Sequence, residues 1–164
     1  MEYWKEYLGI LGYAGALVEL LASKLPSTII AVSDKTATDL SQRLHCQQPI
    51  VVVENGISVS EIRRVPSKPA KYDVVYMGRL IEHKNITLLL DAILLLKYEH
   101  QFSLLIVGDG PDRVRLEKQV RHKDISALVT FIGAIAGNAA YGYVKSAKIF
   151  VLPSKREGFG IAVL

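Results

Sequence analysis

The chain has 164 residues, of which 50% are hydrophobic and 22% are charged, and its formal net charge is +4. This composition is typical of a globular chain that forms a core, and it excludes an intrinsically disordered one. The basic residues are scattered apart from one cluster at 63–68, which argues against a nucleic-acid-binding face. Cys46 is the single cysteine, so an internal disulfide is excluded, and we expect an inert thiol in a reducing, cytoplasmic setting.

The N-terminal stretch at 8–22 has apolar residues at helical spacing and predicts a helix. It is shorter than the roughly 18 apolar residues that a membrane span requires, and it carries Glu19. One interpretation is a helix buried against a neighbouring element. The other is a peripheral helix on the cytoplasmic face of a membrane, because Tyr3, Trp4 and Tyr7 lie near its start.

Two short β-branched runs, at 27–32 and 50–53, predict strands. Between them, the pair Ser33-Asp34 offers an N-cap for a helix that ends near residue 44. The segment 60–71 contains two prolines, several charges and no apolar periodicity, so it is the best domain boundary. We therefore expect the tail of a first domain at 1–59, an interdomain linker at 60–71 and part of a second domain at 72–164.

Beyond residue 72 the pattern becomes regular. Short apolar runs recur at 73–77, 103–107, 128–132 and 148–152, and each is followed by a turn that contains glycine or proline. The stretches between them predict helices that begin near Asn85, Pro111 and Asn138, and the first helix has Leu88, Ala92 and Leu95 on one face. Strand runs that are apolar throughout and alternate with helices predict a doubly wound α/β fold, with a parallel sheet covered on both faces.

Glycines and charged residues follow these runs, at the ends where the strands should finish. Ligands of such sheets bind outside the carboxyl ends of the strands, so these residues mark a candidate site. They are Gly78, Arg79, Gly108, Asp109, Gly110, Gly133 and the segment 153–158.

The loop at 78–84 places Arg79 and Lys84 just before a helix start. Helix N-termini favour anions, and a guanidinium with an ammonium suits a diphosphate. The alternative is that both are solvated surface charges. Gly108-Asp109-Gly110 suggests a dinucleotide-binding turn, but the third glycine of that pattern is replaced by Arg113, so the evidence for NAD is weak. We expect a tight turn that allows close approach of backbone or ligand, with Asp109 as a turn residue and helix N-cap.

Glu157 is the one acidic residue in the turn after the last run, and Gly158 and Gly160 follow it. Its carboxylate could accept hydrogen bonds from sugar hydroxyls or stabilise an oxocarbenium-like centre. The alternative is an ion pair with Lys155 or Arg156. The sequence has no nucleophile triad, phosphate-binding Walker loop or metal-ligand cluster, and its four histidines are isolated and expected to be exposed.

Four blocks, GRLIEHKN, LLIVGDGPDRVRLEKQ, VTFIGAI and AKIFVLPSKREGFGIAVL, resemble the carboxyl-terminal domain of group 1 glycosyltransferases in order and spacing. These are retaining enzymes of the GT-B fold that use a nucleotide-diphospho-sugar donor. The resemblance covers 73–164 and extends more weakly back through 29–40 and 51–58. It implies a transfer of a hexosyl group to a saccharide or lipid-linked acceptor, without metal or other cofactor.

The resemblance also implies roles for the matched residues. Arg79 and Lys84 would hold the diphosphate, Phe131 to Gly133 would form the edge of the base pocket, and Glu157 would contact the donor sugar as the catalytic residue. The expected donor-binding set is Gly78, Arg79, Lys84, Gly108, Gly110, Phe131, Ile132, Gly133, Gly158, Phe159, Gly160 and Ile161.

The chain departs from the family pattern in two ways. The second glutamate of the E-x7-E signature would fall at position 165, and the loop at 136–144 lacks the acidic residues common there. We therefore expect a piece of a longer enzyme that is inactive alone. The alternatives are a nucleotide-sugar 2-epimerase of the same fold and a catalytically inactive nucleotide-sugar-binding fragment.

Overall fold

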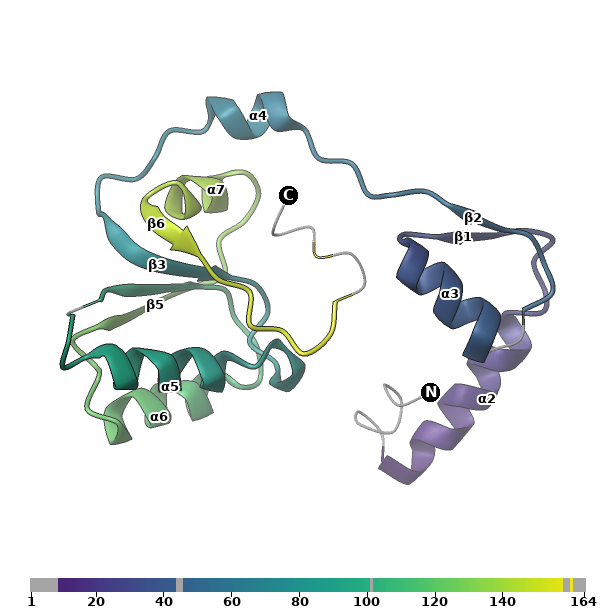
Figure 1. The fold of residues 1–164 in the computed structure, drawn as a ribbon, viewed down its shortest axis with the longest axis horizontal. Helices are drawn as coiled ribbons and strands as arrows, with labels where there is room; N and C mark the ends of the chain where they lie inside the picture. Colours follow the sequence, from purple (N-terminus) through teal and green to yellow (C-terminus); the bar gives the residue numbers. More distant parts are fainter. Residues whose placement is uncertain (1–8, 44–45, 101, 158–159, 161–164) are drawn as a thin grey trace. The chain divides into compact units, whose positions relative to one another are not determined.

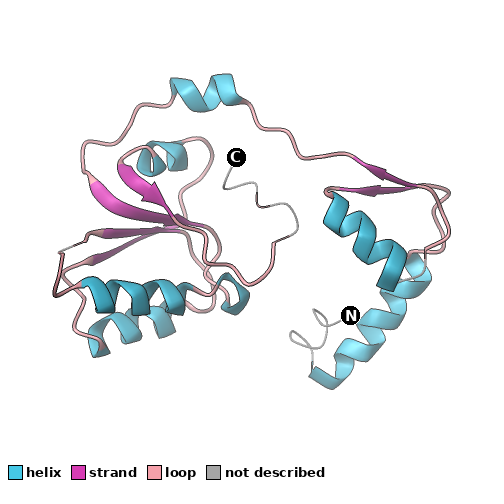
Figure 2. Ribbon diagram, in the orientation of Figure 1, coloured by secondary structure: helices cyan, strands magenta, loops and turns pink. Residues whose placement is uncertain are grey.

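The structure is a computed structural model, and it describes every residue except 1–8, 44–45, 101, 158–159 and 161–164 (Figure 1). The chain divides into two compact units, a first unit at Met1–Gly56 and a second unit at Ile57–Leu164. The helices and strands of both units can be followed in Figure 2.

The first unit pairs two short parallel strands, in which Ile29 lies opposite Ile50. The Ser33 hydroxyl accepts the Thr36 N–H at 3.1 Å, which caps the helix between the strands as predicted. In chain order the elements are η1 (Gly9–Leu11), α2 (Gly12–Ala22), β1 (Ile29–Ala31), α3 (Asp34–Arg43) and β2 (Ile50–Val52).

The helix α2 buries two small residues and exposes most of its large apolar ones. Gly12 and Ala16 are buried, whereas six large apolar side chains of this region are exposed. Those exposed side chains are Ile10, Leu11, Tyr13, Leu17, Val18 and Leu21. The expectation of a helix buried along its apolar face is therefore wrong for the described residues. None of the helices among those residues is long and apolar enough to span a membrane.

The second unit is built on a four-stranded parallel sheet in the order β5-β4-β3-β6. The four apolar runs form these strands, with ends within two residues of those predicted, and the doubly wound α/β fold is confirmed. The elements are α4 (Val59–Arg64), β3 (Tyr72–Met77), η2 (Glu82–Lys84), α5 (Ile86–Leu96), β4 (Leu104–Val107), α6 (Arg113–His122), β5 (Val129–Gly133), α7 (Ala139–Val144) and β6 (Ala147–Phe150).

Both faces of this sheet are covered, with α5 and α6 on one side and α7 on the other (Figure 1). Alternate strand residues serve the two layers: Leu104 and Ile106 pack toward α5 and α6, and Leu105 packs toward α7. All four residues of β4 are buried because this strand is covered on both faces and paired on both edges.

The buried face of α5 differs from the predicted one. Ile86, Leu89, Leu90 and Ile93 are buried, whereas Leu88 is 56% and Leu95 76% exposed. The sequence ITLLLDAILLL is apolar almost all round, so its spacing does not select a face. Asn85 and Asn138 occupy the N-cap positions of α5 and α7, where the helices were predicted to begin, but neither side chain forms a capping hydrogen bond.

At the amino ends of the strands, one carboxylate joins three strands. Asp73 Oδ2 accepts the backbone N–H and the hydroxyl of Ser103, both at 2.9 Å, and its Oδ1 lies 2.7 Å from Lys148 Nζ. Lys148, followed by the Ser103 groups, holds the pKa of the Asp73 carboxyl well below its usual range.

The segment predicted as a linker contains α4 and is attached to α7. Lys145 Nζ donates to the carbonyls of Ile62 at 2.6 Å and Val65 at 2.7 Å, and the Lys68 N–H donates to Gly142 at 2.9 Å. A cation at the end of a helix satisfies carbonyls that have no partner within the helix. The division between the units falls upstream of this segment, after Gly56.

Candidate functional site

The loops that follow β3, β4 and β5 meet at the carboxyl edge of the sheet, as the topology predicted. The Gly78 N–H donates to Val107 at 3.0 Å, and the Gly108 N–H donates to Gly133 at 2.8 Å. The Leu80 N–H donates to the Asp109 carbonyl at 2.9 Å. The backbone pairing of the sheet therefore continues past the strand ends and fixes the loops against one another.

Two glycines permit this close approach. Gly108 has φ +143°, and a Cβ atom there would lie 1.9 Å from the Gly78 carbonyl oxygen. A Cβ at Gly110 would lie 2.4 Å from the carbonyl oxygen of Leu80. Both glycines thus allow the backbones of neighbouring loops to pack closely, as the predicted close approach of backbone or ligand at this turn had included. Their contact with a donor stays a prediction.

Tyr76 anchors the loop at 78–84 from the adjacent strand β3, a role that the sequence interpretation missed. Its side chain is fully buried, and its hydroxyl donates to the Arg79 carbonyl at 2.9 Å. A Cβ at Gly78 would lie 2.8 Å from that hydroxyl. Burial, and then the negative charge of Glu157, raise the pKa of Tyr76. The signal in the sequence was a hydroxyl-bearing residue between Val75 and Met77, near the end of the first run.

Lys84 and Glu157, which are 73 residues apart, meet at this edge. Lys84 Nζ donates to Glu157 Oε1 at 2.6 Å, with the two side chains 18% and 27% exposed. A backbone hydrogen bond at 2.9 Å, from the Lys155 N–H to the His83 carbonyl, ties the two loops together. Glu157 therefore forms an ion pair, as the alternative interpretation predicted. Its partner is Lys84, which that interpretation did not name.

The pKa of Glu157 reflects this pairing. Burial by itself raises the pKa, but the hydrogen bond from Lys84 and the charges of Lys84 and His83 outweigh burial and lower it. The buried Ser154 hydroxyl is close enough to add to this effect, although it forms no hydrogen bond of standard geometry with any described residue. The carboxylate is therefore ionised and ready to accept hydrogen bonds.

Arg79 is exposed beside a shallow cavity of about 290 Å³ at the same edge. The lining residues come from the ends of β3 and β4 and from the segment after β5: Met77, Gly78, Arg79, Val107, Gly108, Asp109, Ala134, Ile135 and Ala140. Phe131 packs against one core layer and Ile132 against the other, and their place at the edge of a base pocket stays a prediction. The residues just after them, Ala134 and Ile135, line the cavity.

Arg113 occupies the position of the missing third glycine and organises the turn after β4. It donates to Asp109 Oδ2 at 3.0 Å and to Glu117 Oε1 at 2.9 Å. Asp109 Oδ1 accepts the Gly110 N–H at 2.7 Å, so Asp109 is a turn residue as expected. It is not the N-cap, because α6 begins at Arg113 after Asp112.

Of the remaining predicted residues, some are described by the structure and others lie outside the described part of the chain. Gly160 has φ +76°, whereas Gly158, Phe159 and Ile161 lie outside the described residues. His100 and His122 are exposed and His83 is half-buried, while His45 also lies outside the described part of the chain. Within that part, no group of three or more His, Cys, Asp or Glu side chains could hold a metal ion.

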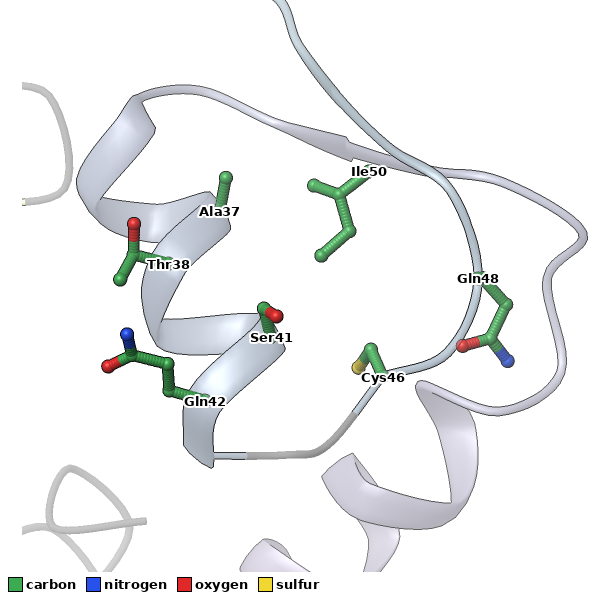
Figure 3. Close-up of a pocket in the computed structure, with 7 residues that line it drawn as sticks. All are labelled: Ala37, Thr38, Ser41, Gln42, Cys46, Gln48 and Ile50. Atoms are coloured by element: carbon green, nitrogen blue, oxygen red, sulfur yellow. The ribbon is translucent and has the colours of Figure 1, made fainter.

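A separate cavity of about 430 Å³ lies in the first unit, between α3 and β2 (Figure 3). Its lining residues are Ala37, Thr38, Ser41, Gln42, Cys46, Gln48 and Ile50, which include no Lys, Arg, Asp or Glu. It therefore offers no counter-charge for an anionic ligand, in contrast to the edge of the sheet in the second unit.

The chain is similar in sequence to several glycosyltransferases. The protein shares 33% identity over 91 residues with an uncharacterized glycosyltransferase of Methanocaldococcus jannaschii, covering 56% of this chain and 23% of that protein. It shares 23% identity over 154 residues with the 2-deoxystreptamine N-acetyl-D-glucosaminyltransferase of Niallia circulans, covering 87% and 40%. The chain spans 23% to 41% of the length of these and similar curated relatives.

Solved structures show the same fold. Sucrose-phosphate synthase from Thermosynechococcus elongatus superposes with a TM-score of 0.75 at 23% identity, covering 89% of this chain and 39% of that one. HepE of Anabaena, in complex with UDP and glucose, superposes with a TM-score of 0.74 at 19% identity, covering 96% and 46%. The family profile described as glycosyl transferases group 1 matches residues 58–164. The chain therefore belongs to the group 1 glycosyltransferases and has their GT-B-type fold.

Proposed function

We propose that the protein transfers a hexosyl group from a nucleotide-diphospho-sugar donor to a saccharide or lipid-linked acceptor, with retention of anomeric configuration. The observation that carries this proposal is the meeting of Lys84 and Glu157 at 2.6 Å. An ammonium suits the phosphate of such a donor, and a carboxylate beside it suits the hydroxyls of the attached sugar. The two groups thus match the two chemical parts that a nucleotide-diphospho-sugar joins.

The electrostatics of the edge favour departure of a diphosphate. As the bond to the sugar breaks, negative charge grows on the departing phosphate, and cations already in place stabilise that charge. Lys84 lies at this edge, and Arg79 lies exposed in the same loop. Glu157 is ionised and faces the positive charge that develops on the sugar.

The cavity beside Arg79 is the proposed binding site of the nucleoside. Its lining is mostly aliphatic and backbone, which suits a flat ring better than a second charged group. The solved neighbours HepE and TarM were determined with UDP, so a uridine donor is the first candidate.

Calorimetric titration of the protein with UDP-, GDP- and ADP-sugars tests the donor site. We expect Arg79→Ala and Lys84→Ala each to weaken binding about tenfold or more, because each removes a charge-assisted contact to phosphate. Lys118→Ala removes an exposed cation of α6 and serves as the matched control, with affinity unchanged. Unchanged affinity in both loop variants would refute the assignment.

Retention and the nature of the product are tested separately. Proton NMR of the glycoside formed should show the anomeric configuration of the donor. The 164 residues alone are expected to give no turnover, since they span less than half of the curated relatives. Robust transfer by those residues would contradict this expectation.

A further inference from the structure

The ion pair between Lys84 and Glu157 occupies the same two groups that the proposed donor would use, and the inference below rests on that donor site. The two side chains are only 18% and 27% exposed, and Nζ and Oε1 lie 2.6 Å apart. In the free protein each group therefore satisfies the other. A phosphate that takes Lys84 must leave the carboxylate without its main partner.

The surrounding backbone is held in place, so the partners can change by side-chain rotation alone. The Lys155 N–H donates to the His83 carbonyl, and the Lys84 N–H donates to the Ile81 carbonyl at 3.0 Å. The flexible four-carbon stem of Lys84 allows its ammonium to move between two nearby acceptors without movement of either loop.

A second donor is already present beside the carboxylate. The Ser154 hydroxyl is buried without a hydrogen-bond partner among the described residues, and it lies three residues before Glu157. This hydroxyl already lies close enough to Glu157 to lower the pKa of the carboxyl, although without a hydrogen bond of standard geometry, and it gains by forming a full one once Lys84 has left. One hydroxyl replaces an ammonium only in part, because it carries no charge.

We propose that the Lys84–Glu157 ion pair is an exchange device that couples recognition of the donor diphosphate to recognition of the donor sugar. The diphosphate draws Lys84 away, and the freed carboxylate accepts the hydroxyls of the sugar. A diphosphate with no sugar attached leaves Glu157 without its main cationic partner, and the neutral hydroxyl of Ser154 replaces that partner only in part. Glu157 therefore competes with the bare diphosphate for Lys84, which favours the intact donor over the nucleoside diphosphate product and assists its release.

Titration with inorganic pyrophosphate separates this device from simple ligand contacts. Glu157→Gln should bind pyrophosphate about fivefold tighter than the unmodified protein, because Lys84 loses its competing partner. Glu82→Gln removes an equal charge from the neighbouring exposed position and should change affinity less than about twofold, since long-range charge effects there are screened. Ser154→Ala should weaken binding, because the carboxylate then lacks the hydroxyl that would take the place of Lys84.

Lys84→Met distinguishes a failure of the proposed exchange from a failure of the proposed donor site. If Lys84→Met abolishes pyrophosphate binding but Glu157→Gln leaves it unchanged or weaker, the exchange is overturned and the phosphate site stands. If Lys84→Met leaves the affinity unchanged, the donor site itself is refuted. An equal gain in Glu82→Gln and Glu157→Gln would show general repulsion of anions and would also overturn the exchange.

Discussion

Substitution of Gly108 by alanine should be among the most destabilising changes in the second unit. The added Cβ would lie 1.9 Å from the Gly78 carbonyl oxygen, and real Cβ atoms essentially never come closer than 3.0 Å to such an atom. The obstructing atom is backbone, so no side-chain rotation relieves the contact. The loops after β3 and β4 must separate.

The size of the effect follows from what that separation breaks. The hydrogen bonds from Gly78 to Val107 and from Gly108 to Gly133 lie on either side of the clash, and each contributes about 1 kcal/mol. A non-glycine residue held at φ +143° adds roughly 1–3 kcal/mol of backbone strain. Together these contributions predict a loss of about 3–5 kcal/mol in the free energy of unfolding.

Urea unfolding monitored by circular dichroism measures this loss. Gly137→Ala is the matched control, because Gly137 also has a positive φ, +58°, but has no atom within 4 Å of an added Cβ. We expect a loss of about 1–2 kcal/mol there, from backbone conformation alone. Equal losses in the two variants would refute the close approach of the loops at Gly108.

Two further predictions test the core and the amino edge of the sheet. Leu90→Ala should lower the free energy of unfolding by about 2–5 kcal/mol, because Leu90 is fully buried. Leu95 is exposed, so Leu95→Ala should change it by less than about 0.5 kcal/mol. Similar losses for the two variants in urea unfolding would contradict the observed buried face of α5. Asp73→Asn should lower the melting temperature at pH 7. Because folding lowers the pKa of Asp73, its contribution is complete above about pH 4 and is lost as the pH falls through the lower folded value. Melting curves should therefore converge in acid, and a difference that stays constant between pH 7 and pH 2 would count against the Asp73 network.

The sequence predicted the parts of the fold that are governed by local pattern. The strands and the parallel sheet follow from apolar runs that alternate with predicted helices. The topology of such a sheet then places Arg79, Lys84 and Glu157 at its carboxyl edge. The cap at Ser33 was also predicted, because its hydrogen bond to Thr36 is local in the sequence. These features need only neighbouring residues or a general rule of connection.

The features that were missed depend on contacts between distant residues. The face of α5 is chosen by the sheet beneath it, since the helix itself is apolar on several sides. The attachment of α4 depends on Lys145, which lies more than 80 residues further along the chain. The partner of Glu157 depends on how two loops meet, whereas the sequence showed only its adjacent cations, Lys155 and Arg156.

A crystal structure of the protein with UDP tests the central claim most directly. We predict that phosphate oxygens lie within hydrogen-bonding distance of Lys84 Nζ and of the Arg79 guanidinium, and that Lys84 no longer contacts Glu157. UDP bound with its phosphates elsewhere, and with the Lys84–Glu157 ion pair intact, would contradict the proposed donor site.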